Sequence, residues 1–230
     1  MSFLRKLFKD FTKCNFILWT ISSVAIILSF FLFGNTQYHY LIGSLMGISA
    51  LTFVSKGHPF GQFLIIVFSV FYGVISFSFK YYGEMITYLC MSAPFAVVAL
   101  ISWIKNPAGR GSSEVKINTL SKTEIIIFPF LTVAVTVAFY FILRALNTNN
   151  LVISTVSVFT SFSAAYLTSR RCRFYAVCYS LNDVVLIVMW ILASIENISY
   201  LPMVICFVSF LALDGYGFIN WSKMQKRQKE

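Results

Sequence analysis

One apolar stretch of the chain carries aromatic and polar side chains that a helix would place on a single face. Aromatic faces suit a flat heteroaromatic ring, with stacking worth up to about 1.5 kcal/mol beyond burial, and a cationic ring gains roughly 0.5–2 kcal/mol more. This helix face therefore predicts a surface that binds a ligand, with packing against neighbouring helices as the alternative. At about 100° per residue, roughly a third of the helix circumference collects Tyr175, Tyr179, Asn182, Asp183, Leu186 and Trp190.

Two acidic residues, Asp183 and Asp214, are the only ones well inside apolar stretches. An ionised carboxylate in lipid costs at least about 2.5 kcal/mol, so both are expected to face the protein interior or a cavity. Either they contact a ligand, where a negative charge neutralises a cationic ring, or they form a structural hydrogen bond between helices. In another stretch Tyr88 lies one turn from Glu84. Tyr88 joins the candidate ligand contacts, whereas Glu84 is expected to be a solvated charge at a helix end.

Composition places these side chains in lipid. Hydrophobic residues make up 58% of the 230 residues and charged residues only 11%, against roughly a quarter charged in ordinary globular proteins. The net charge of +10 is typical of nucleic-acid-binding proteins, but the charges are clustered between apolar stretches, which argues against nucleic acid as a partner. No Ser–His, paired-carboxylate or His/Cys constellation predicts a catalytic centre, a metal site or a cofactor, so we do not expect an enzyme.

Eight apolar stretches follow one another along the chain, most of them close to the roughly 20 residues that span a bilayer. The sequence therefore predicts an all-α integral membrane protein with eight transmembrane helices. The stretches are Asn15–Phe33, Tyr40–Val54, Phe60–Phe79, Met85–Ile104, Ile125–Leu143, Leu151–Leu167, Phe174–Ile195 and Leu201–Ile219.

The basic residues alternate between the two sides of the predicted membrane. With a cytoplasmic amino terminus, 16 of the 18 Lys and Arg residues fall in inner segments, and only Lys80 and Arg144 fall outside. A cytoplasmic excess of basic residues is the general rule, and a wrong helix count would scramble the alternation. Both termini and the Asn106–Thr123 linker are therefore expected in the cytoplasm. Ser2–Lys13 alternates Phe and Leu with Lys and Arg, which predicts a segment lying along the inner membrane surface.

The chain contains a weak internal repeat of two three-helix units, at about Tyr40–Trp103 and Leu151–Trp221. In both, a tyrosine near the start of the third helix precedes the final tryptophan by 21 residues. Both units begin outside and end inside, so they run parallel, and the span between them supplies the odd crossing that this requires. Such symmetry is typical of transporters. Trp103 and Trp221 are expected to be aromatic anchors at the inner interface.

Small and polar residues form further stripes in three of the predicted spans. Such stripes usually let helices approach closely, so they are expected to be helix-packing seams. They comprise Gly43, Gly47, Gln62, Ser69, Gly73, Ser76, Ser154, Ser157 and Ser161.

Four motifs occur in order along the chain: Met46-Gly47-Ile48 through Lys56-Gly57; Tyr82-Gly83-Glu84-Met85; Asn182-Asp183-Val184-Val185 with Trp190; and Asp214-Gly215-Tyr216-Gly217 with Asn220-Trp221. In this order and spacing they resemble the PnuC-type vitamin transporters, a family named for nicotinamide riboside uptake in bacteria. The likeness covers nearly the whole chain after the first span.

The resemblance implies one N-terminal helix plus a 3+1+3 core of two parallel three-helix bundles, similar to the SWEET sugar transporters, with the substrate between the bundles. It implies facilitated diffusion of a small B vitamin such as nicotinamide riboside across the bacterial cytoplasmic membrane, with trapping by phosphorylation. The expected division of the chain is 1–13 amphipathic segment, 14–37 N-terminal helix, 38–105 first bundle, 106–148 linker and inversion helix, 149–222 second bundle, and 223–230 basic cytoplasmic tail.

The chain departs from the family on the surface that faces the substrate. Tyr175 and Cys178 stand where the family has a Trp-x-x-Trp pair, and Leu64, Thr87 and Tyr88 stand where asparagines are expected. The vitamin is left open among nicotinamide riboside, thiamine and riboflavin, and a sensor or binding subunit without flux is the alternative function. The expected partners are the vitamin and the lipid bilayer, and a homo-oligomer is left open.

A cysteine at Ser112 in a cysteine-free background tests the predicted orientation. Because the linker is expected in the cytoplasm, a membrane-impermeant thiol reagent should label this cysteine only after the membrane is opened. A cysteine at Arg144, predicted outside, is the control that should react on intact cells. Labelling at position 112 on intact cells would overturn the topology.

Overall fold

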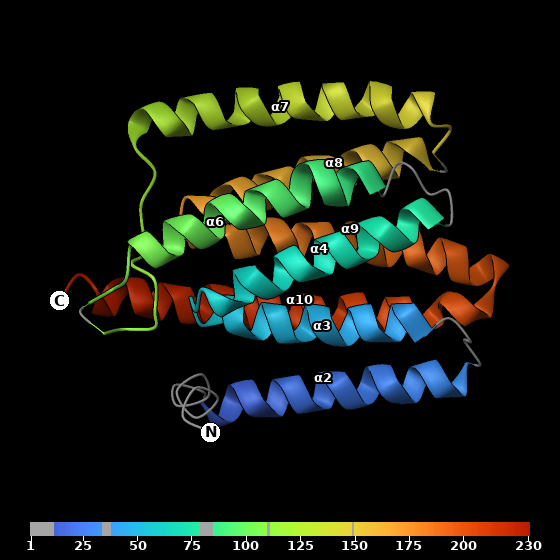
Figure 1. Cartoon of the computed structure of the whole chain (residues 1–230), viewed down its shortest axis with the longest axis horizontal. Helices are drawn as coiled ribbons and strands as arrows, with labels where there is room; N and C mark the ends of the chain where they lie inside the picture. The colour runs from blue at the N-terminus through green and yellow to red at the C-terminus, as the bar shows by residue number, and fades with distance from the viewer. Residues whose placement is uncertain (1–11, 34–37, 79–84, 110, 149) are drawn as a thin grey trace.

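The chain folds almost entirely into helices. The structure, a computed structural model, describes residues 12–33, 38–78, 85–109, 111–148 and 150–230. Most of the predicted amphipathic segment 1–13 and the Tyr82-Gly83-Glu84 motif lie outside these residues. In chain order the helices are α2 (Lys13–Leu32), α3 (Tyr38–Ser55), α4 (Phe60–Ser78), η1 (Thr87–Ser92), α6 (Ala93–Lys105), α7 (Lys122–Ala145), α8 (Leu151–Ser169), α9 (Tyr175–Glu196), η2 (Ile198–Tyr200) and α10 (Leu201–Arg227) (Figure 1).

Six helices in the described part of the chain are long and apolar enough to cross a bilayer. α3 and α4 lie alongside them (Figure 1), and the apolar part of α4, Phe60–Val74, is shorter. The chain is therefore an all-helical, multi-pass membrane protein, as the sequence predicts. The six are Lys13–Leu32, Thr87–Lys105, Lys122–Ala145, Leu151–Ser169, Tyr175–Glu196 and Ile198–Arg227.

The last helix extends further than the apolar pattern predicts. α10 continues past Ile219 through Lys223 and Lys226 to Arg227, so most of the segment expected as a basic tail is helical. Lys, Gln and Arg are good helix formers, and cations in the last turn interact favourably with the helix dipole. The other helix ends agree with the predicted stretches to within a few residues.

Six helices close into a ring. α3 packs on α4 and α4 on α6, while α8 packs on α9 and α9 on α10. Contacts of α3 with α10 and of α6 with α8 complete the ring. α7 packs on α8 from outside and α2 packs on α3 and α10, at the upper and lower edges of Figure 1. Each junction between the two halves thus joins the first helix of one half to the last helix of the other.

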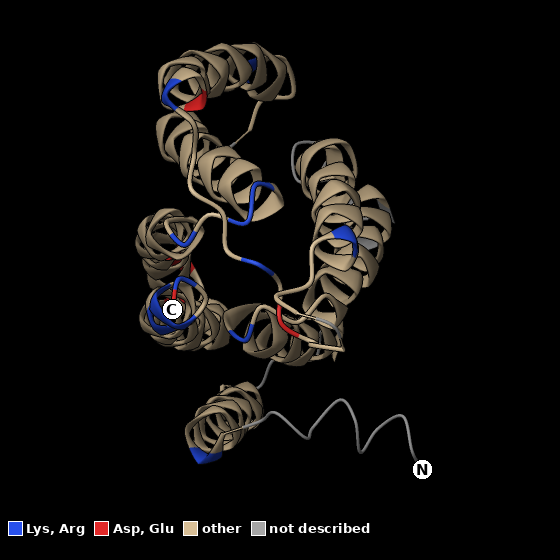
Figure 2. Cartoon of the chain, turned by 90° about the vertical axis from the view of Figure 1, so that its left-hand side faces the viewer, with Lys and Arg blue, Asp and Glu red and all other residues tan. Residues whose placement is uncertain are grey.

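The linker between α6 and α7 crosses one end of the ring and ties the two halves together. The N–H of Val115 donates to the carbonyl of Gly57 (3.0 Å), and the N–H of Asn118 donates to that of Arg171 (2.9 Å). Gln228, just after α10, donates its side-chain amide to the carbonyl of Val115 (3.1 Å). Figure 2 looks onto this end, with lysines and arginines at helix ends and along the linker.

The helix that leads into α6 is locally widened. η1 is a π-helix, and Pro94 follows it in the first turn of α6. Proline has no N–H and its ring clashes with the carbonyl four residues earlier, here that of Cys90, and a π-turn accommodates this disruption. π-turns are frequent at functional sites. The residues Thr87 and Tyr88 of this turn line the cavity described below.

Glycines allow close approach between the helices of the ring. A Cβ added to Gly43 of α3 would lie 2.1 Å from the ring of Tyr72 on α4, and one added to Gly47 would lie 2.5 Å from the ring of Phe210 on α10. The packing role predicted for these two glycines is confirmed. At Gly61 the neighbour is backbone rather than a side chain, because its added Cβ would lie 2.7 Å from the amide nitrogen of Val54.

Gly61→Ala should destabilise the protein by about 1–3 kcal/mol, the usual cost of overpacking, because the backbone of α3 blocks the new methyl group. Gly215→Ala on α10 is the matched control, since nothing lies within 4 Å of its added Cβ and alanine favours a helix interior. Thermal unfolding in detergent measures both. Equal unfolding temperatures for the two variants would contradict the close approach of α3 and α4.

Candidate functional site

A cavity of about 1120 Å³ lies inside the ring of helices. Small-molecule sites typically occupy roughly 300–1000 Å³, so the cavity has room for a small metabolite and water. At the end away from the linker, Asn147, Asn150 and Glu196 are among its lining residues. At the linker end, a cluster of buried side chains that includes Trp103, Val115 and Trp221 fills the ring instead.

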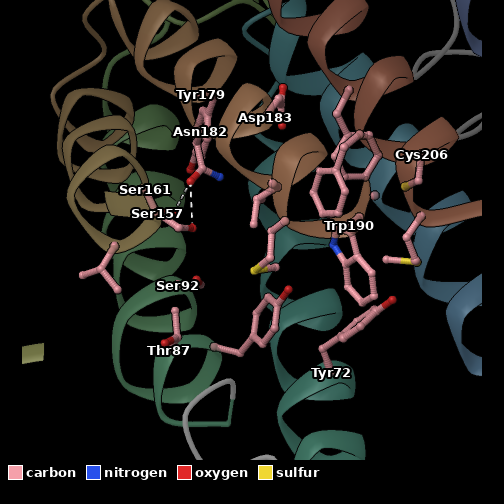
Figure 3. A pocket seen from close by; sticks show the side chains of 18 of the residues that line it. Tyr72, Thr87, Ser92, Ser157, Ser161, Tyr179, Asn182, Asp183, Trp190 and Cys206 are labelled. Atoms are coloured by element: carbon pink, nitrogen blue, oxygen red, sulfur yellow. Dashed lines mark hydrogen bonds between the residues drawn. The ribbon is translucent and has the colours of Figure 1, made fainter. Parts of the chain in front are cut away.

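The structure brings most of the predicted ligand residues together in this cavity. They come from η1, α9 and α10, and Figure 3 shows several of them around one space. Tyr175 is the exception: it is fully buried in the cluster at the linker end of the cavity, with its ring 4.7 Å from that of Trp221. The predicted residues that line the cavity are Tyr88, Tyr179, Asn182, Asp183, Trp190 and Asp214.

Asn182 is held by three hydroxyl groups of α8. Ser157, Thr160 and Ser161 donate to its side-chain oxygen, at 3.1, 2.9 and 2.9 Å. A carbonyl oxygen has two lone pairs and Thr160 can instead donate to the carbonyl of Val156 or Ser157, so the hydroxyl groups suffice to saturate the oxygen and fix the amide plane. The NH₂ group is then the free end of the side chain, and in Figure 3 it points away from the hydroxyl groups. Asn182 therefore offers the cavity an oriented donor of two hydrogen bonds.

From the sequence, the serine hydroxyl groups of α8 are predicted to form only a helix-packing seam. In the structure Ser154, Ser157 and Ser161 line the cavity. Two of them also bind Asn182, so this stripe both joins α8 to α9 and orients a cavity residue. Two residues of α4, Gln62 and Ser69, are also buried and line the cavity. The side-chain nitrogen of Gln62 and the hydroxyl group of Ser69 have no protein partner.

Asp183 and Asp214 form a carboxyl pair across α9 and α10. Each is 3% exposed, both line the cavity, and their side chains are hydrogen-bonded to each other. Because an ionised carboxylate can only accept, this hydrogen bond requires at least one of the two groups to be protonated. The described ion pairs, Arg170–Glu124 and Arg227–Glu114, lie away from the cavity lining.

Aromatic rings face the cavity from both halves of the ring of helices. From the first half, Tyr72 and Tyr88 lie with ring centroids 5.4 Å apart, and Phe68 lies 5.8 Å from Tyr88. From the second half, Trp190 and Tyr200 lie 5.7 Å apart. Such surfaces suit a flat ring by stacking. Sequence reasoning missed Phe68, Tyr72 and Tyr200, because a chain with so many aromatic residues marks no individual ring.

Two tryptophans close the linker end of the cavity reciprocally. The indole N–H of Trp103 on α6 donates to the carbonyl of Thr168 on α8 (3.0 Å), and that of Trp221 on α10 donates to the carbonyl of Val54 on α3 (3.0 Å). The two rings lie 5.3 Å apart. Both are fully buried, so the prediction that they are interfacial anchors is wrong. Each indole N–H finds its partner at the end of the facing helix rather than in water.

Comparison with known proteins gives consistent matches. The family model described as "Nicotinamide mononucleotide transporter" matches residues 37–223. The "Nicotinamide riboside transporter PnuC" of Neisseria mucosa is 26% identical over 227 residues, which is 97% of this chain and 86% of the relative. The "Crystal structure of the Vitamin B3 transporter PnuC" has a TM-score of 0.82 at 24% identity, with coverage of 98% of this chain and 97% of that chain.

Replacing both Trp103 and Trp221 by Phe keeps an aromatic ring at each position but removes the two indole N–H donors. Each hydrogen bond contributes about 1 kcal/mol, so opening of this end should become roughly 10- to 30-fold more frequent. Cys172, kept as the single cysteine, reports it because it lies buried in the same cluster and burial raises the pKa of its thiol, which slows its reaction with thiol reagents.

The readout is the labelling rate of Cys172 in vesicles that expose this end, and it should rise in the double variant. Trp190→Phe is the matched control, since Trp190 lies elsewhere on the cavity wall and its change should leave the rate unaltered. An unchanged rate in the double variant would show that the two indole hydrogen bonds do not hold this end closed.

Proposed function

Because the chain belongs to the nicotinamide mononucleotide transporter family, as the motifs in its sequence indicated, we propose that it is a facilitator that carries a small B vitamin, such as nicotinamide riboside, into the bacterial cell. The observation that supports this most is the polar and aromatic cavity enclosed by helices of both halves. A membrane protein places polar side chains at such a site only where they meet one another, water or a passing solute.

The charge of the cavity favours the riboside over the mononucleotide. Its lining includes Asp183, Asp214 and Glu196 but, in the described ranges, no lysine or arginine. A phosphate group at neutral pH carries between one and two negative charges, and phosphate sites are normally built from basic side chains or helix N-termini. A vitamin without phosphate, neutral or cationic, is therefore the proposed substrate class.

Recognition is proposed to divide between the two ends of such a molecule. The NH₂ group of Asn182, fixed by its three hydroxyl partners, donates to a carbonyl or hydroxyl oxygen of the substrate. Tyr88 and Trp190, with Tyr179 on the same wall as Trp190, stack on the heteroaromatic ring. Thiamine also carries a cationic ring, and the acidic lining favours it for the same reason, so it is the second candidate.

We further propose that the ring is the 3+1+3 core, with α7 as the connecting helix and α3 and α4 also crossing the membrane. The start of α2 and the end of α10 lie at the same end of the molecule (Figure 1), and this end carries the basic loops and linker (Figure 2). The excess of basic residues supports a cytoplasmic location for it. The cavity then opens outward and is closed inward by Trp103 and Trp221.

Metabolic trapping follows from the same electrostatics. Once the vitamin is phosphorylated in the cytoplasm, its negative charge is repelled by the acidic residues Asp183 and Asp214. At an effective dielectric constant of about 20, two like charges 4 Å apart repel by about 4 kcal/mol. The phosphorylated product is therefore retained although the carrier itself needs no energy source.

Uptake into liposomes that contain the purified protein tests the proposal. We expect saturable entry of labelled nicotinamide riboside or thiamine, and entry of nicotinamide mononucleotide at least about tenfold slower, since 1.4 kcal/mol of repulsion already gives that factor. Asn182→Leu, which keeps the size but removes the donor, should reduce the apparent affinity by about tenfold or more.

Ser163→Ala is the control for the Asn182 variant, because the Ser163 hydroxyl donates to the carbonyl of Phe159 in its own helix and not to Asn182. If no B vitamin enters while the protein is correctly inserted, the facilitator function is excluded. Binding without entry would instead identify a sensor or binding subunit.

A further inference from the structure

The carboxyl pair of Asp183 and Asp214 is not needed to carry a neutral molecule. A single carboxyl group would supply a hydrogen-bond acceptor, yet two lie together at the cavity wall, close enough to share a proton. Two aspartates that share one proton carry one negative charge, whereas two ionised aspartates carry two. The pair therefore has two charge states that differ by one proton.

A second observation shows that the pair is aimed at the cavity. The Oδ2 atom of Asp183 has no hydrogen-bond partner in the protein, although the residue is 97% buried and lines the cavity. A buried carboxyl oxygen without a partner is costly. In Figure 3 the Asp183 side chain stands at the edge of the space that also holds Trp190 and Tyr72. A cationic group in the cavity would satisfy this oxygen.

Among the residues that the structure describes, none next to the pair supplies a compensating positive charge. The titratable groups that act on it are Tyr175 and Tyr179 of α9 and Cys206 of α10, whose ordinary pKa values leave them neutral near pH 7. The neighbouring helices α3 and α8 present the hydroxyl groups of Ser44 and Thr168, which bind Cys206 and Tyr179.

The remaining elements packed against α9 and α10 bring no cation to the pair. The charged or titratable residues described in α2 are Lys13 and Cys14 at its first turn, and η2 contributes Tyr200, which lines the cavity. None of them acts on either carboxyl group. A cation that approaches the pair must therefore come with the cargo or be a proton.

We propose that Asp183 and Asp214 form a proton site whose shared proton is released when a cationic cargo enters the cavity. This inference rests on the proposed vitamin transport. The exchange balances: the singly protonated pair and a cation give the doubly ionised pair with its bound cation and one proton, which leaves through the cavity to water. The net charge of the site stays at minus one, because the second carboxylate charge is paired with the charge of the bound cation. A neutral cargo leaves the proton in place.

Calorimetric titration of the purified full chain tests this directly. The binding heat of nicotinamide riboside, which is a cation, is compared in two buffers of different ionisation enthalpy, and the uncharged, reduced dihydropyridine form of the riboside is the matched neutral ligand. We expect about one proton released per cation bound and none per neutral molecule. The dissociation constant for the cation should fall by up to about tenfold per unit rise in pH, with no change for the neutral form.

Asp183→Asn and Asp214→Asn should each abolish the proton release, whereas Glu114→Gln on the linker should preserve it. The comparison of the two ligands on the unaltered protein keeps the test valid even where an aspartate variant does not fold. Binding of both forms with equal proton release, or with none, overturns the proton site while vitamin transport stands. Absence of binding by either form and by thiamine overturns the proposed function and the proton site with it.

Discussion

The fold depends on one constraint: within a bilayer, every polar group must find a partner inside the protein or face water. The outer surface accordingly carries large apolar side chains, such as Ile126 and Phe130 on α7 and Val152 on α8. The polar side chains of the helices are turned inward instead. Some of these inward groups, such as those of Gln62 and Ser69, have no protein partner and line the cavity inside the ring of helices.

The two ends of this cavity differ in the polarity of the side chains that line them. Toward the linker, indole and aliphatic side chains fill the space inside the ring of helices. The indole N–H groups of the two tryptophans donate to carbonyls at the ends of α3 and α8. The same contact occurs twice because the two halves meet in the same way on both sides. At the other end, the polar side chains of Asn147, Asn150 and Glu196 are among those that line the cavity.

The interior also shows which aromatic side chains reach the surface expected to meet the substrate. Tyr175, at a position where the resemblance led us to expect a tryptophan, packs at the linker end of the cavity against Trp221. The rings that do line the cavity include those of Tyr72, Tyr88 and Trp190. Aromatic contact with a flat cargo is therefore compatible with the loss of the expected tryptophan pair, since other helices supply the rings.

The sequence alone determined the helices and one wall of the cavity. Apolar length and basic residues between the stretches are local properties, and the face shared by Tyr179, Asn182, Asp183 and Trp190 follows from the period of a single helix. The tertiary structure alone decided the other contacts: the hydroxyl groups on Asn182, the approach of Asp183 to Asp214, and the burial of the two tryptophans. These depend on the register and rotation of helices far apart in the chain, and hydrophobic periodicity specifies neither, because any apolar face can pack against any other.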